Sequence, residues 1–213
     1  MDPFMKTASL HLYTADTPNG QKISIALEEL GLDYRQTNVD LNKGEQKAPD
    51  FLALNPNGKI PVFVDEQEQV TLFESAVILT YLANRYGELG GQSAAENLLI
   101  QQWLCFQIAS VGPMLGQLWW FRHGTTTRNE QALERYRRES LRLYGVVESE
   151  LAKRGYIAGE RYTIADIALF TWLRTHEELD LDMSPFPAVQ AWLEKIAKRP
   201  AVQRGLAKSR PEV

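Results

Sequence analysis

The feature that most restricts how this chain can fold is the stretch from residue 55 to 83, NPNGKIPVFVDEQEQVTLFESAVILTYLA. Two short runs of β-branched and aromatic residues, 60–64 and 70–73, are separated by a polar, charged segment, which predicts a β-hairpin. Pro61 cannot donate a ladder hydrogen bond, so we expect it in the first residues of the hairpin. The apolar run at 76–83 then predicts a buried helix that begins at Glu74-Ser75.

Two positions in this stretch suggest a binding site. Ile60-Pro61 is a candidate cis bond, which would present a backbone N–H and C=O outward, although only about 5–6% of X-Pro bonds are cis. Glu74-Ser75 lies at a helix start, where unpaired N–H groups and the positive end of the dipole favour an anion. The alternative is that Ser75 or Glu74 merely caps the helix. A carboxylate beside an anion site makes chemical sense when the ligand also carries an amine.

The segments before this stretch predict a βαβ unit. Residues 10–13 are a strand candidate that ends in turn residues, and an i, i+3, i+4, i+7 apolar face over 23–30 indicates a helix. Residues 34–41 then indicate a second strand, so the two strands should be parallel. Together with the later hairpin and helix, the pattern predicts a βαβ-ββα domain.

The rest of the chain is helical in pattern. Residues 87–93, GELGGQS, indicate a linker, and Gly112-Pro113 should kink or interrupt the helix that follows. A Thr-x-x-Asp capping box at 163–166 opens another helix. The expected helices are 94–118, 129–151, 164–174 and 187–199, with an irregular segment at 119–127 and Pro200 ending the last helix.

Composition excludes several function classes. The formal net charge of −4 and the lack of a basic cluster argue against nucleic acid or an anionic membrane as a partner. Cys105 is the single cysteine, which excludes an intrachain disulfide or a CxxC pair, and we expect it to be buried. No uninterrupted apolar run reaches about 18 residues, so no transmembrane helix is expected. No signal peptide is expected either, because the N-terminus lacks a charged segment followed by an apolar core. Residues 1–4, ahead of Met5, look like an added leader.

The loop Thr17-Pro18-Asn19-Gly20 precedes a helix and could meet an anion with its hydroxyl, amide and backbone N–H groups. Its alternative is a helix start capped by Thr17 or Asn19. It is neither a P-loop nor a dinucleotide-binding glycine motif. The three histidines are far apart in sequence, so no metal site is expected. The aromatic run at 119–121 could line an apolar pocket, with core packing or a dimer face as equal alternatives.

Three motifs together resemble the cytosolic glutathione transferases over nearly the whole chain. They are Asn-Gly-Lys-Ile-Pro at 57–61, Leu-Phe-Glu-Ser at 72–75 and Thr-Ile-Ala-Asp-Ile at 163–167. The segments 13–22 and 112–117 are similar to the bacterial Nu-class, relatives of the yeast prion nitrogen regulator.

The resemblance implies an α+β chain with the glutathione transferase fold. A thioredoxin-like domain would occupy residues 5–86, a linker 87–93 and an all-helical domain 94–213. The protein would be a cytoplasmic homodimer that uses glutathione as a substrate, with one or two molecules per subunit left open, and that needs no metal. No nucleic-acid or membrane partner is expected.

The resemblance also implies how glutathione would bind. Glu74 and Ser75, with the helix start, would match the amine and α-carboxylate of its γ-glutamyl end. Ile60, before a cis Pro61, would pair its backbone with the cysteinyl unit. The residues implied for the remaining contacts are Gln46 and Lys59 at the glycyl end and Arg135 across a dimer.

The sequence departs from the familiar classes at the glutathione thiol, where Thr17 and Asn19 stand instead of a Tyr, Ser or Cys. A hydroxyl or amide that donates to sulfur favours the thiolate. The resemblance therefore implies a disulfide-bond reductase that uses the thiol of bound glutathione, because Cys105 lies in the helical domain. The alternatives are a transferase that conjugates glutathione to small electrophiles and a non-catalytic glutathione-binding regulator.

Overall fold

The computed structural model describes residues 9–210, so the leader expected at 1–4 lies outside the described residues. The chain divides into two compact units, one made of the residues up to 88 together with those from 200 onward, and one made of residues 89–199. The domain boundaries expected from the sequence stay a proposal. The two units differ from the expected domains in one respect: the last helix, expected in the helical domain, belongs to the first unit.

The first unit is built on a mixed sheet of four strands: β1 (Leu10–Thr14), β2 (Arg35–Asn38), β3 (Val62–Asp65) and β4 (Val70–Phe73). Their order across the sheet is β2-β1-β3-β4. As predicted, β1 and β2 are parallel, and β3 and β4 form an antiparallel hairpin with Pro61 immediately before it. β1 and β3 pair in antiparallel orientation and join the two halves of the sheet.

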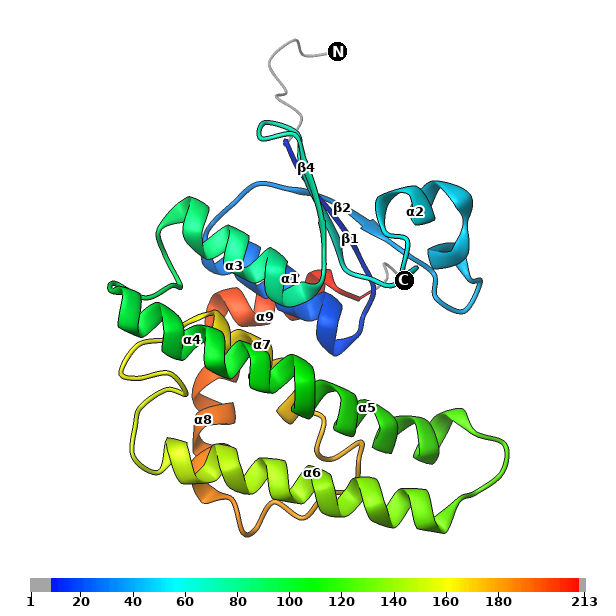
Figure 1. Ribbon diagram of the computed structural model, residues 1–213, viewed down its shortest axis with the longest axis vertical. Helices are drawn as coiled ribbons and strands as arrows, with labels where there is room; N and C mark the ends of the chain where they lie inside the picture. The colour runs from blue at the N-terminus through cyan, green and yellow to red at the C-terminus, as the bar shows by residue number, and fades with distance from the viewer. Residues whose placement is uncertain (1–8, 211–213) are drawn as a thin grey trace. The chain divides into compact units, whose positions relative to one another are not determined.

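Helices cover both faces of this sheet. Helices α1 (Pro18–Glu29) and α3 (Ser75–Tyr86) lie on one side and α2 (Pro49–Leu54) on the other (Figure 1). The sequence did not predict α2, because six residues are too few to show a helical period. Phe51 of α2 nevertheless packs on Val39 and Val62 in a small buried cluster of its own.

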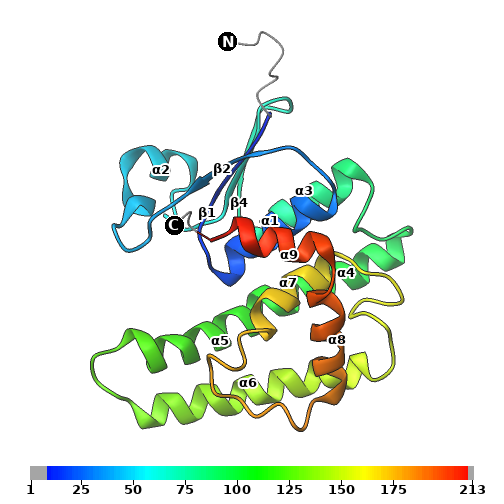
Figure 2. The ribbon, with the colours of Figure 1, turned by 180° about the vertical axis from the view of Figure 1, so that it is seen from behind.

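The final helix, α9 (Pro200–Lys208), packs against α1 within this unit (Figure 2). The prediction that Pro200 ends a helix was incomplete. The preceding helix stops at Ala197, and Pro200 then starts α9, where its missing N–H costs nothing. The two helices approach so closely that a Cβ at Gly205 would lie 2.6 Å from Ile25 Cα. Glu28 of α1 also pairs with Arg204 and Lys208.

The second unit is all-helical. The prediction of an irregular segment at 119–127 was wrong in its first half, because helix continues to Gly124. Gly112-Pro113 does not break the helix either. The missing N–H of Pro113 is accommodated by a preceding π-helical turn, a common response to a lost hydrogen bond. The elements are α4 (Ala94–Phe106), η2 (Gln107–Val111), α5 (Gly112–Trp119), η3 (Trp120–Gly124), α6 (Glu130–Leu151), α7 (Ile164–Leu173) and α8 (Pro187–Ala197).

The continuous helical stretch Ala94–Gly124 is long and apolar enough, by length and composition alone, to cross a membrane. The sequence-based expectation rested on uninterrupted apolar runs and did not register this average hydropathy. The core helix of a folded helical unit has the same character, and this stretch packs on α6 and α7. Through these contacts the stretch forms part of the packed helical unit, with 39% of its most apolar window buried.

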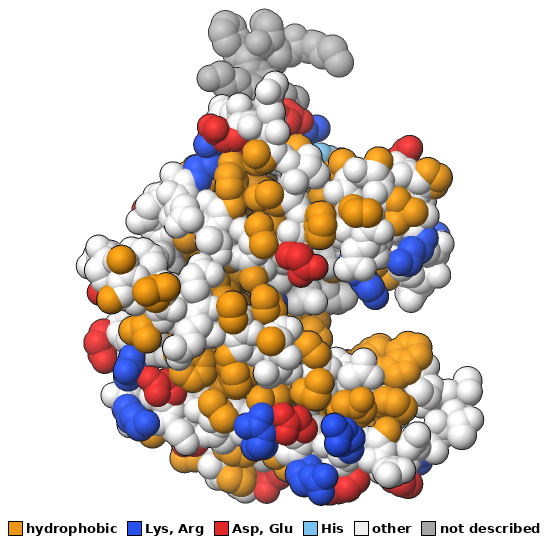
Figure 3. Space-filling model, viewed as in Figure 1, with side chains coloured by type: hydrophobic (Ala, Val, Ile, Leu, Met, Phe, Trp, Pro, Cys, Tyr) orange, Lys and Arg blue, Asp and Glu red, His pale blue; other side chains and the backbone are white. Residues whose placement is uncertain are grey.

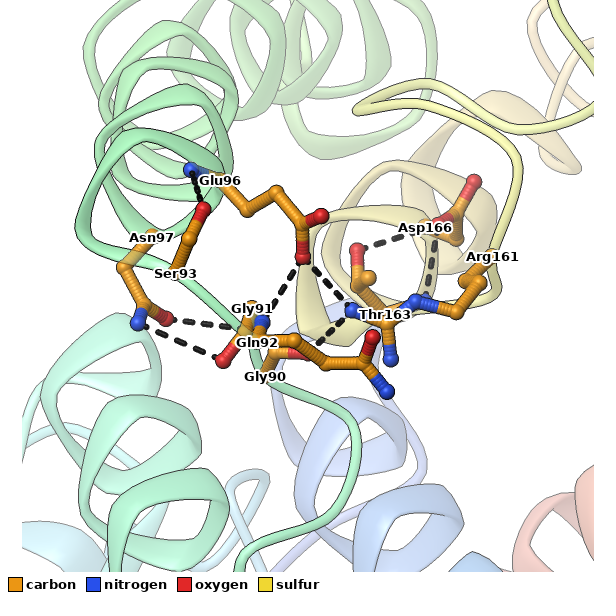
Figure 4. Close-up of polar contacts among 9 residues, drawn as sticks. All are labelled: Gly90, Gly91, Gln92, Ser93, Glu96, Asn97, Arg161, Thr163 and Asp166. Atoms are coloured by element: carbon orange, nitrogen blue, oxygen red, sulfur yellow. Dashed lines mark hydrogen bonds and ion pairs between the residues drawn. The ribbon is translucent and has the colours of Figure 1, made fainter.

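The second half of the expected linker is fixed to the helical unit (Figure 4). The backbone N–H of Gly91 donates to Asn97, that of Gln92 donates to Glu96, and the guanidinium of Arg161 reaches the carbonyl of Gly90. Ser93 caps α4 as its Oγ accepts from the N–H of Glu96. Residues 90–93 thus form an ordered start to this unit.

The capping box that opens α7 is present, as the sequence predicted. Asp166 is fully buried, and its Oδ2 accepts from the N–H of Thr163 at 2.9 Å. Its Oδ1 accepts from the N–H of Ile157 at 2.9 Å and from the indole Nε1 of Trp192 at 3.0 Å. One carboxylate therefore joins α7, α8 and the loop between α6 and α7.

Cys105 is exposed, so the expectation of a buried thiol was wrong. It lies on α4 next to Trp103 and Leu104, which are the residues turned into the core. The apolar neighbours in sequence misled the prediction, because adjacent residues on a helix point about 100° apart.

Candidate functional site

Several of the predicted site residues gather at one end of the four-stranded sheet. Tyr13 pairs with Val62, and Val62 pairs with Phe73, in antiparallel register. This register sets the end of β1, the residue Pro61 before β3 and the residue Glu74 after β4 side by side. The two helices that begin at this end, α1 and α3, bring their N-termini to the same place.

The loop before α1 is shaped by a hydrogen bond and a glycine. Thr17 is the N-cap of α1, and its Oγ1 accepts from the N–H of Gly20 at 3.3 Å. The capping alternative is therefore confirmed for Thr17, whose hydroxyl can still donate its own hydrogen. Gly20 is required for the close turn, because a Cβ there would lie 2.3 Å from the carbonyl oxygen of Ala15.

The start of α3 does not look like an ordinary cap. Glu74 occupies the N-cap position, yet its side chain makes no capping hydrogen bond and is exposed. Its backbone has φ 70° and ψ 112°, a conformation that non-glycine residues rarely adopt and that is concentrated at functional sites. The first N–H groups of α3 accordingly have no capping side chain at Glu74, and Ser75 is buried beside them.

Lys22 joins these two helix starts. It lies in the second turn of α1 and is 1% exposed. Its ammonium Nζ is 2.9 Å from Asn19 Oδ1 and 3.0 Å from Ser75 Oγ. Burial lowers the pKa of Lys22 to about 7, and the charge of Glu74 acts in the opposite direction.

The peptide bond Ile60-Pro61 is cis, as the sequence suggested. The loop that leads to it is held by Asn55, whose side chain donates to the carbonyl of Lys59 at 2.7 Å and accepts from the N–H of Asn57 at 2.9 Å. Pro61 is buried, whereas Lys59 is exposed.

Gln46 lies next to this loop. A Cβ at Gly58 would come 3.0 Å from the Gln46 carbonyl and 2.8 Å from the Lys47 ammonium, so the two loops touch. Gln46 Nε2 is 3.5 Å from the carbonyl of Leu41, and its Oε1 is buried with no hydrogen-bond partner among residues 9–210. An unpaired buried acceptor is costly unless a ligand satisfies it. Lys47 and Lys59, on the two sides of this contact, are both exposed.

Arg135 lies in the other unit, on the exposed side of α6. Its charge helps to hold the pKa of Glu139 below its usual range, after the larger contribution of Arg142. Figure 3 shows basic and acidic side chains mixed along the edge where α6 lies. A role for Arg135 across a dimer stays a prediction.

In the aromatic run at 119–121, the indole of Trp119 makes a hydrogen bond within the second unit. Trp119 Nε1 donates to Glu178 at 2.5 Å, and Phe121 stacks on Tyr136. Trp120 is half exposed. These contacts place the run at the surface of the helical unit and leave its proposed use as an apolar pocket a prediction.

Sequence reasoning missed Lys22 and Lys47. Lys47 lacks a sequence signal, because its place beside Gly58 depends on two loops meeting. Lys22 had a weak signal, a lysine placed three residues after Asn19 and next to Ile23 in a helix with a strong apolar face. Its burial comes from the whole of residues 20–28 being enclosed, which no period in the sequence reveals.

The lowered pKa of Lys22 predicts a dependence of stability on pH. Between about pH 7 and pH 10, an unfolded chain carries the Lys22 proton while the folded chain has released it. The free energy of unfolding should therefore rise with pH across this window, by up to about 1.4 kcal/mol per pH unit from this group. Urea unfolding at a series of pH values measures the slope, and Lys22→Met should flatten it. An equal slope in both proteins would contradict the prediction.

Comparisons with known proteins agree with this geometry. Residues 8–84 match the family model "Glutathione S-transferase, N-terminal domain", and residues 102–200 match "Glutathione S-transferase, C-terminal domain". The chain is 42% identical over 205 residues to the disulfide-bond oxidoreductase YfcG of Escherichia coli, covering 94% of this chain and 95% of that protein. It is also 31% identical over 229 residues to the transcriptional regulator URE2 of Saccharomyces cerevisiae, covering 89% of this chain and 65% of that protein.

A solved relative has the same fold and a bound ligand. The crystal structure of a glutathione transferase from Burkholderia graminis matches with a TM-score of 0.93 and 40% identity, covering 99% of this chain and 92% of that chain. That structure holds two glutathione molecules bound per subunit.

Proposed function

Because the chain belongs to the glutathione S-transferase family, we propose that it is a glutathione-dependent disulfide reductase that uses the thiol of bound glutathione. The observation that carries the proposal is the Thr17–Gly20 loop, which brings a hydroxyl and an amide, but no thiol, to the start of α1. The 42% identity to a disulfide-bond oxidoreductase supports it.

The position of Cys105 supports the use of glutathione rather than a protein thiol. It is the only cysteine in the sequence and lies on α4, in the unit that does not contain the Thr17 loop. In the proposed reaction, the thiolate of one glutathione attacks a disulfide, forms a mixed disulfide and releases one thiolate. A second glutathione then attacks the mixed disulfide, so that two glutathiones become glutathione disulfide and the substrate becomes two thiols.

The proposed binding mode uses the sheet end described above. The amine of the γ-glutamyl end lies against Glu74, and its carboxylate lies against Ser75 and the N–H groups at the start of α3. The backbone of Ile60 pairs with the cysteinyl unit, and Gln46 and Lys59 hold the glycyl end. The pair of glutathiones in the Burkholderia graminis structure supports room for two molecules in each subunit.

At the sulfur, Thr17 and Asn19 act as hydrogen-bond donors. Such donors stabilise the thiolate relative to the thiol and so lower the thiol pKa from its ordinary value of about 8.5. The thiolate is the form that attacks a disulfide. We place the protein in the Nu-class, as a cytoplasmic homodimer with Arg135 reaching the partner subunit's site.

The proposal is tested by assaying the purified protein with glutathione and a small organic disulfide, next to conjugation of glutathione to an aryl halide. We expect strong reduction and weak conjugation, with reduction greatly diminished in Thr17→Ala and retained in Thr17→Ser, which keeps both the hydroxyl and the cap. Strong conjugation with weak reduction would instead assign a conventional transferase. Glutathione binding without either activity would assign a binding protein, as the similarity to a transcriptional regulator allows.

A further inference from the structure

A single buried ammonium contacts both halves of the proposed glutathione site. Lys22 Nζ is 2.9 Å from Asn19 Oδ1, at the proposed thiol end, and 3.0 Å from Ser75 Oγ, at the proposed γ-glutamyl end. The Lys22–Ser75 bond is buried and joins residues 53 positions apart. No other residue in the site as described above contacts the side chains at both ends.

The chemistry of an ammonium fixes the direction of both hydrogen bonds. A charged lysine has three donors and no acceptor, a neutral one still has two N–H donors, and Nζ of Lys22 donates to both oxygens. The amide oxygen of Asn19 must therefore face Lys22, which turns the NH₂ group of the amide away from it. The oxygen of Ser75 must likewise accept, so the hydroxyl hydrogen of Ser75 points elsewhere.

We propose that Lys22 is a positioning residue that sets the direction of donation in the glutathione site. By occupying the acceptor atoms of Asn19 and Ser75, it makes both side chains donors toward a ligand. The sulfur then meets an N–H of Asn19 and the γ-glutamyl carboxylate meets the O–H of Ser75, so the thiolate and this carboxylate both face donors. This inference rests on the proposed function, because it assumes that glutathione binds here.

The burial of Lys22 supports a role beyond packing. An ammonium loses its hydration when it is buried, and an apolar side chain of similar length would fill the same space without that cost. The carboxylate of Glu74 lies near enough to act on Lys22, and bound glutathione would add a carboxylate near Ser75. Charged and titratable groups on the other elements packed against α1 are engaged elsewhere: Arg204 and Lys208 of α9 with Glu28, His11 of β1 with Thr37, and Tyr81 and Arg85 of α3 with Asp65.

The experiment compares the wild-type protein with Lys22→Met in its binary complex with glutathione. The ultraviolet absorbance of the thiolate, followed against pH, reports the pKa of the bound thiol without any turnover. In Lys22→Met we expect this pKa to rise toward that of free glutathione and the glutathione affinity to fall about 10-fold. Lys43→Met is the matched control, because Lys43 is in the same unit, is exposed and pairs only with Asp40 in the contacts described here. It should change neither quantity.

A second variant separates the effect of hydrogen-bond direction on the thiol pKa from an effect of misfolding. Lys22→Gln keeps a neutral donor in the same place and should give a bound-thiol pKa between those of the wild type and Lys22→Met. An unchanged thiol pKa in folded Lys22→Met would overturn the proposal, even if activity fell, and so would a thiol pKa in Lys22→Gln equal to that in Lys22→Met, because the retained donor would then have no effect. A wild-type protein that binds glutathione but reduces no disulfide would refute the proposed function alone, since the thiol pKa still decides the role of Lys22. A wild type that binds no glutathione would overturn both.

Discussion

Replacing Asn19 by Asp is expected to lower the glutathione-dependent disulfide reductase rate about 100-fold. This is the usual effect of removing one hydrogen-bond donor from an anion in an active site, here the glutathione thiolate. The two side chains have nearly the same shape. The carboxylate can still accept from Lys22, as the amide oxygen does at 2.9 Å, but it cannot donate to sulfur. Its negative charge also raises the pKa of a nearby thiol, so less thiolate is present at neutral pH.

The loss should be catalytic and should not reflect unfolding. A carboxylate beside the Lys22 ammonium is a favourable partner, so thermal stability should be kept or increased. Asn42→Asp is the matched control, because Asn42 is exposed in the same unit and the substitution is the same. Rates are measured with saturating disulfide across pH. A rate for Asn19→Asp within a few-fold of the wild type would remove Asn19 from the proposed chemistry.

The largest effect on stability is expected at Asp166, outside the candidate site. Asp166→Ala removes an acceptor of four hydrogen bonds, from Ile157, Trp192 and the N–H and hydroxyl of Thr163. It leaves buried donors without partners, and each costs about 1–3 kcal/mol. We expect the free energy of unfolding to fall by about 4 kcal/mol and the melting temperature by roughly 10 °C. Urea unfolding and calorimetry measure the two quantities.

The same substitution at an exposed position gives the comparison. Asp182 accepts from the N–H and the hydroxyl of Ser184 in a surface turn, so Asp182→Ala should change stability only slightly. If the two variants were destabilised equally, the buried position of Asp166 would not be the cause. Burial raises the pKa of Asp166 to about 6, while the hydrogen bonds that it accepts oppose this shift. Removing the carboxyl therefore also removes part of the free-energy cost of burying it. For this reason the expected fall in the free energy of unfolding is smaller than the loss of four full hydrogen bonds would give.

Local patterns predicted most of the elements that frame the site. The hairpin β3–β4, the parallel pairing of β1 with β2, and the helix starting at Ser75 all follow from runs of a few residues with their own period or turn chemistry. The Thr163 capping box was also readable, because the two partners are three residues apart. The short α2 and the helical continuation through η3 were not, since too few residues or an altered helical period hide the pattern.

The sequence by itself determined the residue types of the candidate site: a threonine and an asparagine before α1, Ile-Pro before β3, and Glu-Ser at the start of α3. These are local features, encoded by neighbours along the chain. Only the tertiary structure decided that Lys22 is enclosed, that α9 returns to pack on α1, and that Asn19 and Ser75 share one ammonium. The physical reason is that burial and hydrogen-bond direction depend on segments tens of residues apart meeting in space, and a charged side chain in a helix carries no local mark of which environment it will meet.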